Sequence, residues 1–181
     1  MKKEIIDFYK KSEQLRNGYI VSLSKTNDEE LRKFRKIFPN VSEMFFEMYS
    51  FANGTKADIK DQKFFDFIPG FRLMPIEELM GNYEKHTIED NKVDSILIPF
   101  LNDYAGCYYA YSKKDDVEVI VYISEEGIEI VHNSVMNFWI TINAFYDENV
   151  YFLDDDGYLS YDFEREGIIG RKLNPSVCYW N

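Results

Sequence analysis

Apolar residues in the first half of the chain recur at the three- and four-residue spacing of amphipathic helices. This spacing predicts four helices, over 2–16, 28–38, 41–52 and 75–83. Pro39 separates the second from the third, and Asn53-Gly54 ends the third, with Gly54 expected in a left-handed C′ position. Polar loops are predicted over 55–63 and 84–95.

The second half of the chain alternates apolar and polar residues with the two-residue period of a sheet. Four antiparallel strands are predicted there, over 96–101, 106–112, 117–123 and 127–131. Hairpin loops are expected at 113–116 and 124–127, and a closing helix at 134–146. Shorter strands are predicted earlier, at 19–23, 64–68 and 71–74. The order of elements predicts an α+β single domain over 1–181, with a central antiparallel twisted sheet flanked by helices.

Composition supports one folded unit. The chain has 181 residues, of which 45% are hydrophobic and 17% aromatic, which is enough to bury a full core. Its 14 Tyr are too many to be buried completely, so some are expected at the surface, where their rings suit binding interfaces.

The net charge of −11 changes the picture of possible partners. A field of this sign repels nucleic acid and anionic membranes and attracts basic proteins. No apolar run is long enough to cross a bilayer, and the start of the chain does not read as a signal peptide. Cys107 and Cys178 are far apart and form no metal-ligand pattern, so a reduced cytoplasmic protein is predicted.

The segment 150–181 is acidic at its start and apolar at its end, so it is expected to pack on the core as an extension. Asp154, Asp155, Asp156 and Gly157 do not fit a calcium loop, because the aligned end positions are both Phe. An acidic turn between two short strands is expected instead. If the turn has a function, it is to meet Lys and Arg of a partner.

Candidate chemistry is sparse. His86 lies in a polar loop and His132 at a strand end, both expected to be solvated, and neither has a recognisable nucleophile beside it. No catalytic residue, cofactor or metal ligand is predicted, and the chain is expected not to be an enzyme. Asp103 lies in an Asn-Asp turn, where it is expected to cap backbone amides, with a partner contact as the alternative.

Four segments between residues 27 and 147 resemble the SUKH superfamily, the Smi/Knr-like proteins. Phe38-Pro39 followed by a helix and Asn53-Gly54 resembles the family's opening motif, although the usual Leu is replaced by Phe38. Ile98-Pro99-Phe100 through Gly106 is similar to its strand–turn–strand motif, with Tyr104-Ala105 in place of part of a Gly pair. The strand at 117–123 and the helix at 134–146 resemble its later elements.

The resemblance implies a non-enzymatic binding protein. In bacteria it implies an immunity protein that binds a cognate toxin, such as a nuclease, and blocks it in the cytoplasm; the alternative is a regulatory or scaffold domain for an endogenous protein, as in cell-wall assembly. The expected partner is a basic toxin domain. Acidic charge and loop placement give these contact candidates: Asp103, Tyr104, Asp115, Asp116, Glu118, Asp154, Asp155 and Asp156.

Overall fold

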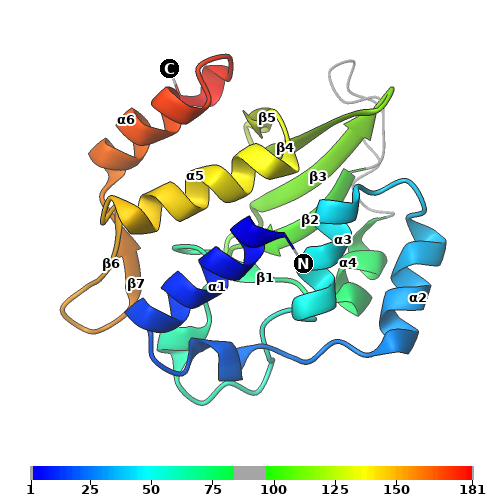
Figure 1. Cartoon of the computed structure of the whole chain (residues 1–181), viewed down its shortest axis with the longest axis horizontal. Coiled ribbons are helices and arrows are strands. Elements are labelled where there is room, and N and C mark those ends of the chain that lie inside the picture. The colour runs from blue at the N-terminus through cyan, green and yellow to red at the C-terminus, as the bar shows by residue number, and fades with distance from the viewer. Residues whose placement is uncertain (1, 84–96, 181) are drawn as a thin grey trace.

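A five-stranded antiparallel sheet organises the chain, as seen in a computed structural model (Figure 1). The structure describes residues 2–83 and 97–180. Strands that are neighbours in the sheet are also neighbours in sequence, so the sheet is a meander. The strands are β1 (Arg72–Leu73), β2 (Leu97–Asn102), β3 (Tyr108–Lys114), β4 (Val117–Ser124) and β5 (Gly127–His132). The predicted α+β class with an antiparallel sheet is confirmed.

Helices pack against this sheet and against one another. They are α1 (Lys3–Leu15), α2 (Asp28–Ile37), α3 (Glu43–Phe51), α4 (Ile76–Tyr83), α5 (Val135–Asp147) and α6 (Phe163–Leu173). α5 crosses the sheet and α1 lies on α5 (Figure 1). α4 packs beside β2, and α2 packs against α4.

Aromatic rings join the helices to the sheet. The Phe45 ring of α3 stacks on Tyr111 of β3 with centroids 4.6 Å apart. Phe100 of β2 meets Phe45 edge-on at 5.4 Å and Phe138 of α5 at 5.6 Å. Each such pair adds about 0.5–1.5 kcal/mol beyond the burial of its area. The high aromatic content therefore serves the core first.

Asn53-Gly54 does more than end α3. The Asn53 side-chain oxygen accepts a hydrogen bond of 2.7 Å from the Ile76 N–H and so caps α4. Gly54 has φ +78°, in the left-handed region as predicted. Ala52 is the C-cap of α3, so Asn53 occupies the C′ position and Gly54 lies one residue further along the chain. A Cβ at Gly54 would lie 2.5 Å from the Pro75 nitrogen. The pair therefore fixes how closely α3 and α4 approach each other.

Two predicted strands are wrong. Residues 19–23 contain a 3₁₀ helix, η1 (Tyr19–Ser22), and 64–68 begin with the last residue of another, η2 (Gln62–Phe64). The Ser22 hydroxyl donates to the carbonyls of Tyr19 and Phe64, which links the two segments without a strand ladder. Tyr19, Leu23, Phe67 and Ile68 are buried without pairing in the sheet, whereas Ile20 and Val21 are exposed. A short apolar run therefore does not distinguish a strand from an irregular buried segment here.

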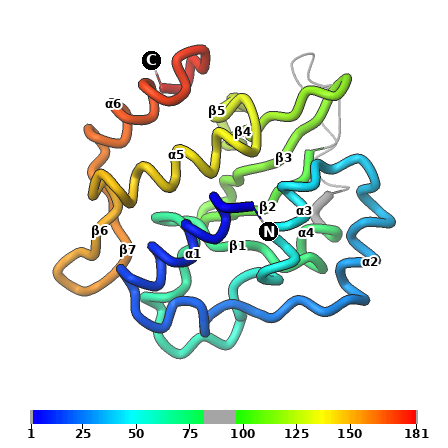
Figure 2. The backbone as a smooth tube through the Cα atoms, viewed as in Figure 1, coloured from blue at the N-terminus to red at the C-terminus, as the bar shows by residue number. Residues whose placement is uncertain are grey.

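The C-terminal part forms a hairpin and a helix. β6 (Tyr151–Leu153) pairs with β7 (Leu159–Tyr161), which confirms the acidic turn between two short strands. α6 follows and was not predicted; it lies alongside α5 (Figure 2). The last turn is a 3₁₀ helix, η4 (Cys178–Trp180), where the Trp180 ring nitrogen donates a 2.7 Å bond to the Val131 carbonyl.

Candidate functional site

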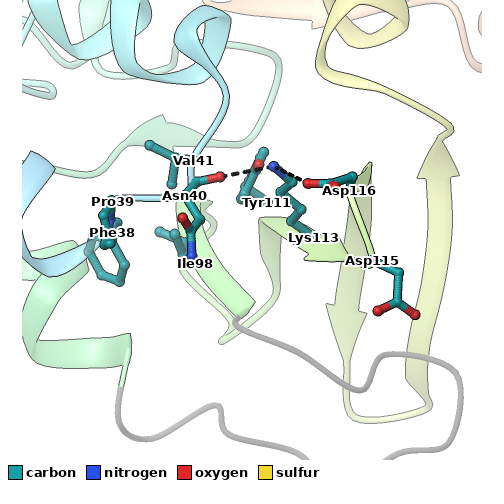
Figure 3. A pocket seen from close by; sticks show the side chains of 9 residues that line it. All are labelled: Phe38, Pro39, Asn40, Val41, Ile98, Tyr111, Lys113, Asp115 and Asp116. Atoms are coloured by element: carbon teal, nitrogen blue, oxygen red, sulfur yellow. Dashed lines mark hydrogen bonds and ion pairs between the residues drawn. The ribbon is translucent and has the colours of Figure 1, made fainter.

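A pocket of about 350 Å³ lies between the α2–α3 connection and the β3–β4 hairpin (Figure 3). It brings together Phe38, Pro39 and Ile98 with two of the predicted contact residues, Asp115 and Asp116. We call it the hairpin pocket; its lining residues are Phe38, Pro39, Asn40, Val41, Ile98, Tyr111, Lys113, Asp115 and Asp116.

The hairpin beside this pocket turns through two residues only. Asp115 and Asp116 have φ values of +46° and +67°, so both lie in the left-handed region. Aspartate tolerates this conformation better than most side chains, and two such residues form the tight turn that suits twisted strands. Lys113 and Lys114, predicted as part of the loop, belong to β3. The loop is shorter than predicted and holds its carboxylates at the tip.

Lys113 ties the hairpin to the α2–α3 connection. Its Nζ lies 3.3 Å from the Asn40 carbonyl and 3.3 Å from Asp116 Oδ1. In Figure 3 the Asp115 side chain points away from this group. The Asp116 side chain is 98% exposed, so its ion pair contributes little to stability. The hairpin tip thus presents acidic groups to solvent on a short, constrained turn.

Tyr111 closes the inner side of the hairpin pocket. Its hydroxyl accepts a hydrogen bond of 3.2 Å from the Ser42 N–H, and the Glu118 carboxylate acts on it electrostatically. Burial raises the pKa of Tyr111 to about 12. Glu118 Oε2 is buried and has no hydrogen-bond partner among the residues described. Glu118 is therefore a half-buried neighbour of the pocket rather than an open surface charge.

The β2–β3 turn holds two further predicted residues. Asp103 Oδ1 accepts hydrogen bonds from the N–H groups of Ala105 (2.8 Å) and Cys107 (2.7 Å), which confirms its predicted capping role. Tyr104 is 71% exposed, and its hydroxyl donates to Asp66 at 3.4 Å. Burial and the nearby Asp66 raise the pKa of Tyr104 to about 12. Tyr104 is thus an aromatic ring presented on an acidic turn.

The β6–β7 turn holds the last three predicted residues. Asp154 Oδ1 accepts from the N–H groups of Asp156 (3.0 Å) and Tyr158 (2.8 Å), so this side chain builds the turn. Asp155 and Asp156 are exposed, and neither forms an ion pair with a residue that the structure describes. Lys63 Nζ lies 6.0 Å from the centre of the Tyr158 ring.

The predicted contact residues therefore fall into three groups rather than one site. Two of these groups, in the β2–β3 turn and the β6–β7 turn, lie beside segment 62–66. Asp66 contacts Tyr104 of the first turn, and Lys63 approaches Tyr158 of the second. The third group, at the β3–β4 hairpin, lies at the other end of β3. At about 3.3 Å per residue, a strand of this length separates the two ends by about 20 Å.

The environments of His132 and Glu166 differ from what the sequence predicts or were not predicted from it. His132 is buried rather than solvated, and burial lowers its pKa to about 4. Glu166 lies in the first half of α6 among tyrosines, and its burial raises its pKa to about 7. Asp162, which caps α6, was an available signal for that helix. His86 lies outside the described residues.

Comparisons add no family assignment. A scan against protein-family models and a search of curated proteins both found no match for this chain. Within residues 2–83 and 97–180, no group of three His, Cys, Asp or Glu side chains could hold a metal ion. In the same part of the chain, no helix combines the length and hydropathy needed to cross a bilayer.

Proposed function

We propose that this chain is a non-enzymatic binding protein of the Smi/Knr-like class, an immunity protein that neutralises a basic toxin domain by occupying its working surface. The α+β architecture with an antiparallel sheet is compatible with this class. Further support comes from the hairpin pocket, where Phe38-Pro39 and Ile98 of the two resembling motifs meet.

The observation that carries the proposal is the exposure of unpaired acidic groups on short turns. Asp115 at one end of the sheet, and Asp155 and Asp156 near the other, extend into solvent from tight hairpins. Fixed carboxylates on a chain of net charge −11 steer a basic partner toward these turns and raise its association rate. A nuclease groove that binds phosphate would accept such a surface in place of its substrate.

Residence time needs more than charge, because exposed ion pairs contribute little to affinity. Aromatic side chains near the acidic turns supply area that a partner can bury. Tyr104 is 71% exposed and Tyr158 is 45% exposed. Tyrosine is favoured at the centre of interfaces, so these rings are the expected anchors of the complex.

Two matched variants test the acidic surface. Asp115→Asn with Asp116→Asn removes the hairpin charges while keeping a residue type that tolerates the left-handed region. Asp155→Asn with Asp156→Asn does the same in the β6–β7 turn and leaves the turn-building Asp154 in place. The protein is first used to capture its partner from the native host, and the partner is identified by mass spectrometry.

We expect a basic partner whose association rate at low salt falls several-fold with at least one of the two variants and depends less on salt. The variant that leaves the rate unchanged identifies the turn that does not face the partner. A captured partner that is not basic, or equal rates for wild type and both variants, would contradict the proposal and favour the scaffold alternative.

A further inference from the structure

A second pocket, of about 130 Å³, lies where the β6–β7 hairpin and α6 approach the sheet. Rings from distant segments converge there with a carboxylate. We call it the tyrosine pocket and define it by Phe71, Tyr109, Tyr122, Tyr161, Tyr179 and Glu166.

The rings form a connected wall. The centroids of Phe71 and Tyr109 lie 5.0 Å apart, those of Tyr109 and Tyr122 lie 5.6 Å apart, and those of Tyr122 and Tyr179 lie 6.2 Å apart. Their planes meet at angles between 55° and 87°, so the rings are not stacked on one another. Together with Glu166 these rings line the pocket with aromatic surface.

Glu166 supplies negative charge to the pocket without compensation. Among the residues described, no side chain donates a hydrogen bond or an ion pair to its carboxylate. Burial alone raises its pKa to about 7. The Glu166 charge in turn helps to raise the pKa values of Tyr109, Tyr151, Tyr161 and Tyr179. Asp103 and Glu129 act on the neighbouring rings and add charge of the same sign.

The chemistry of the pocket selects its ligand. The faces of aromatic rings carry negative potential, and a carboxylate beside them strengthens the attraction for a cation. A half-buried carboxylate without a donor gains most from a ligand that brings its own N–H groups. At about 130 Å³ the pocket is smaller than the roughly 300–1,000 Å³ of sites for whole small molecules, so it takes one functional group.

We propose that the tyrosine pocket binds a primary alkylammonium group of the kind that ends a lysine side chain. This site is distinct from the hairpin pocket, and it does not depend on the toxin proposal.

The test is a titration of the whole protein followed by NMR of its backbone amides, with n-butylammonium as the probe. Tetramethylammonium has the charge but no N–H group, and 1-butanol has the chain but no charge. We expect saturable shifts at the pocket with n-butylammonium, weaker binding of tetramethylammonium and no saturation with 1-butanol. Equal binding of all three would overturn the proposal.

Glu166→Gln removes the charge and keeps the side-chain shape, and Glu164→Gln is the matched control on the same helix. We expect the first variant to weaken n-butylammonium binding at least tenfold and the second to leave it unchanged. In wild type, binding should be about tenfold weaker at pH 6 than at pH 8, because a carboxyl with a pKa of about 7 is mostly neutral at the lower pH. The raised pKa values of the four tyrosines keep them neutral across this range. Unchanged binding in Glu166→Gln would overturn the proposal.

The source of the ammonium group is resolved with the same titration. A short peptide with one central Lys between Gly residues presents the group as a protein partner would. Binding of the peptide as tight as that of n-butylammonium indicates a lysine side chain as the ligand. Binding of the free amine alone indicates a small molecule. Absence of saturable binding by either would overturn the proposal.

Discussion

A titratable group lies beside each end of α6, and the surroundings of the two groups differ. Near its C-terminal end, His132 lies beneath Asn174 and the Trp180 ring, with its Nδ1 3.3 Å from Asn174 Oδ1. Near its N-terminal end, Glu166 faces a pocket and has no donor among the described residues. The first group is sealed and paired, and the second is open and unpaired. This difference separates a structural group from a candidate binding group.

The hydrogen bonds at the sealed end fix the tautomer of the His132 imidazole. Asn174 Nδ2 donates to Thr141 Oγ1 at 3.0 Å and to the Gly170 carbonyl at 3.1 Å, so Asn174 Oδ1 faces the imidazole as an acceptor. His132 Nδ1 must then carry its proton in the neutral ring. A charged imidazolium here would lie among Phe138 and Trp180, which cannot solvate it.

The largest predicted effect is on acid stability. Burial lowers the pKa of His132 to about 4 from its usual 6.5, so the unfolded chain binds a proton that the folded chain refuses. The free energy of unfolding therefore falls by about 3 kcal/mol as the pH drops from above 6.5 toward 4. Urea unfolding of wild type and His132→Gln between pH 4 and 7 measures this. The difference between the two proteins should change by that amount, and a constant difference would mean that His132 is not sealed.

The next effect concerns the contact that seals this end. A Cβ at Gly170 would lie 2.2 Å from a carbon of the Trp180 ring, so Gly170→Ala must displace the ring and destabilise the fold by about 2 kcal/mol. Gly167, in the same helix, has nothing within 4 Å of such a Cβ. Gly167→Ala should stabilise the fold by about 0.5–1 kcal/mol through helix propensity. Thermal unfolding measures both, and equal effects would show that Trp180 does not pack on α6.

The smallest effect concerns the open end. Burial raises the pKa of Glu166 to about 7, so the folded chain favours the neutral carboxyl. The free energy of unfolding is therefore highest below about pH 4.5 and decreases as the pH rises through 7. Glu166→Gln avoids this cost, so at pH 8 it should be more stable than wild type by about 1 kcal/mol, allowing for partial exposure. At pH 4 the two should be equal. A less stable variant at pH 8 would reveal a cationic partner for Glu166 within the fold.

Much of this fold could be predicted from local patterns. The strands of the meander and helices α1, α2, α3, α4 and α5 were predicted within a few residues, because their apolar spacing matches how they are buried. The strand at 64–68 was wrong because Phe67 and Ile68 are buried within an irregular segment. α6 was missed because Gly167 and Gly170 lower helix propensity, and only the structure shows that Gly170 accommodates Trp180.

The candidate sites were less predictable than the fold. The acidic turns could be found because turn residues are local in sequence. The tyrosine pocket could not, since its residues come from segments between Phe71 and Tyr179 that only the tertiary fold brings together. The division of the acidic candidates into separate groups is likewise a property of strand length and topology.

We propose that this chain neutralises a basic protein by binding it. The most direct measurement is the growth of cells that express the captured partner alone, with wild-type protein, or with the protein carrying all four Asp→Asn substitutions at 115, 116, 155 and 156. We predict arrested growth with the partner alone, full growth with wild type and reduced growth with the variant. Normal growth with the partner alone, or arrest despite the wild-type protein, would contradict the proposed neutralisation.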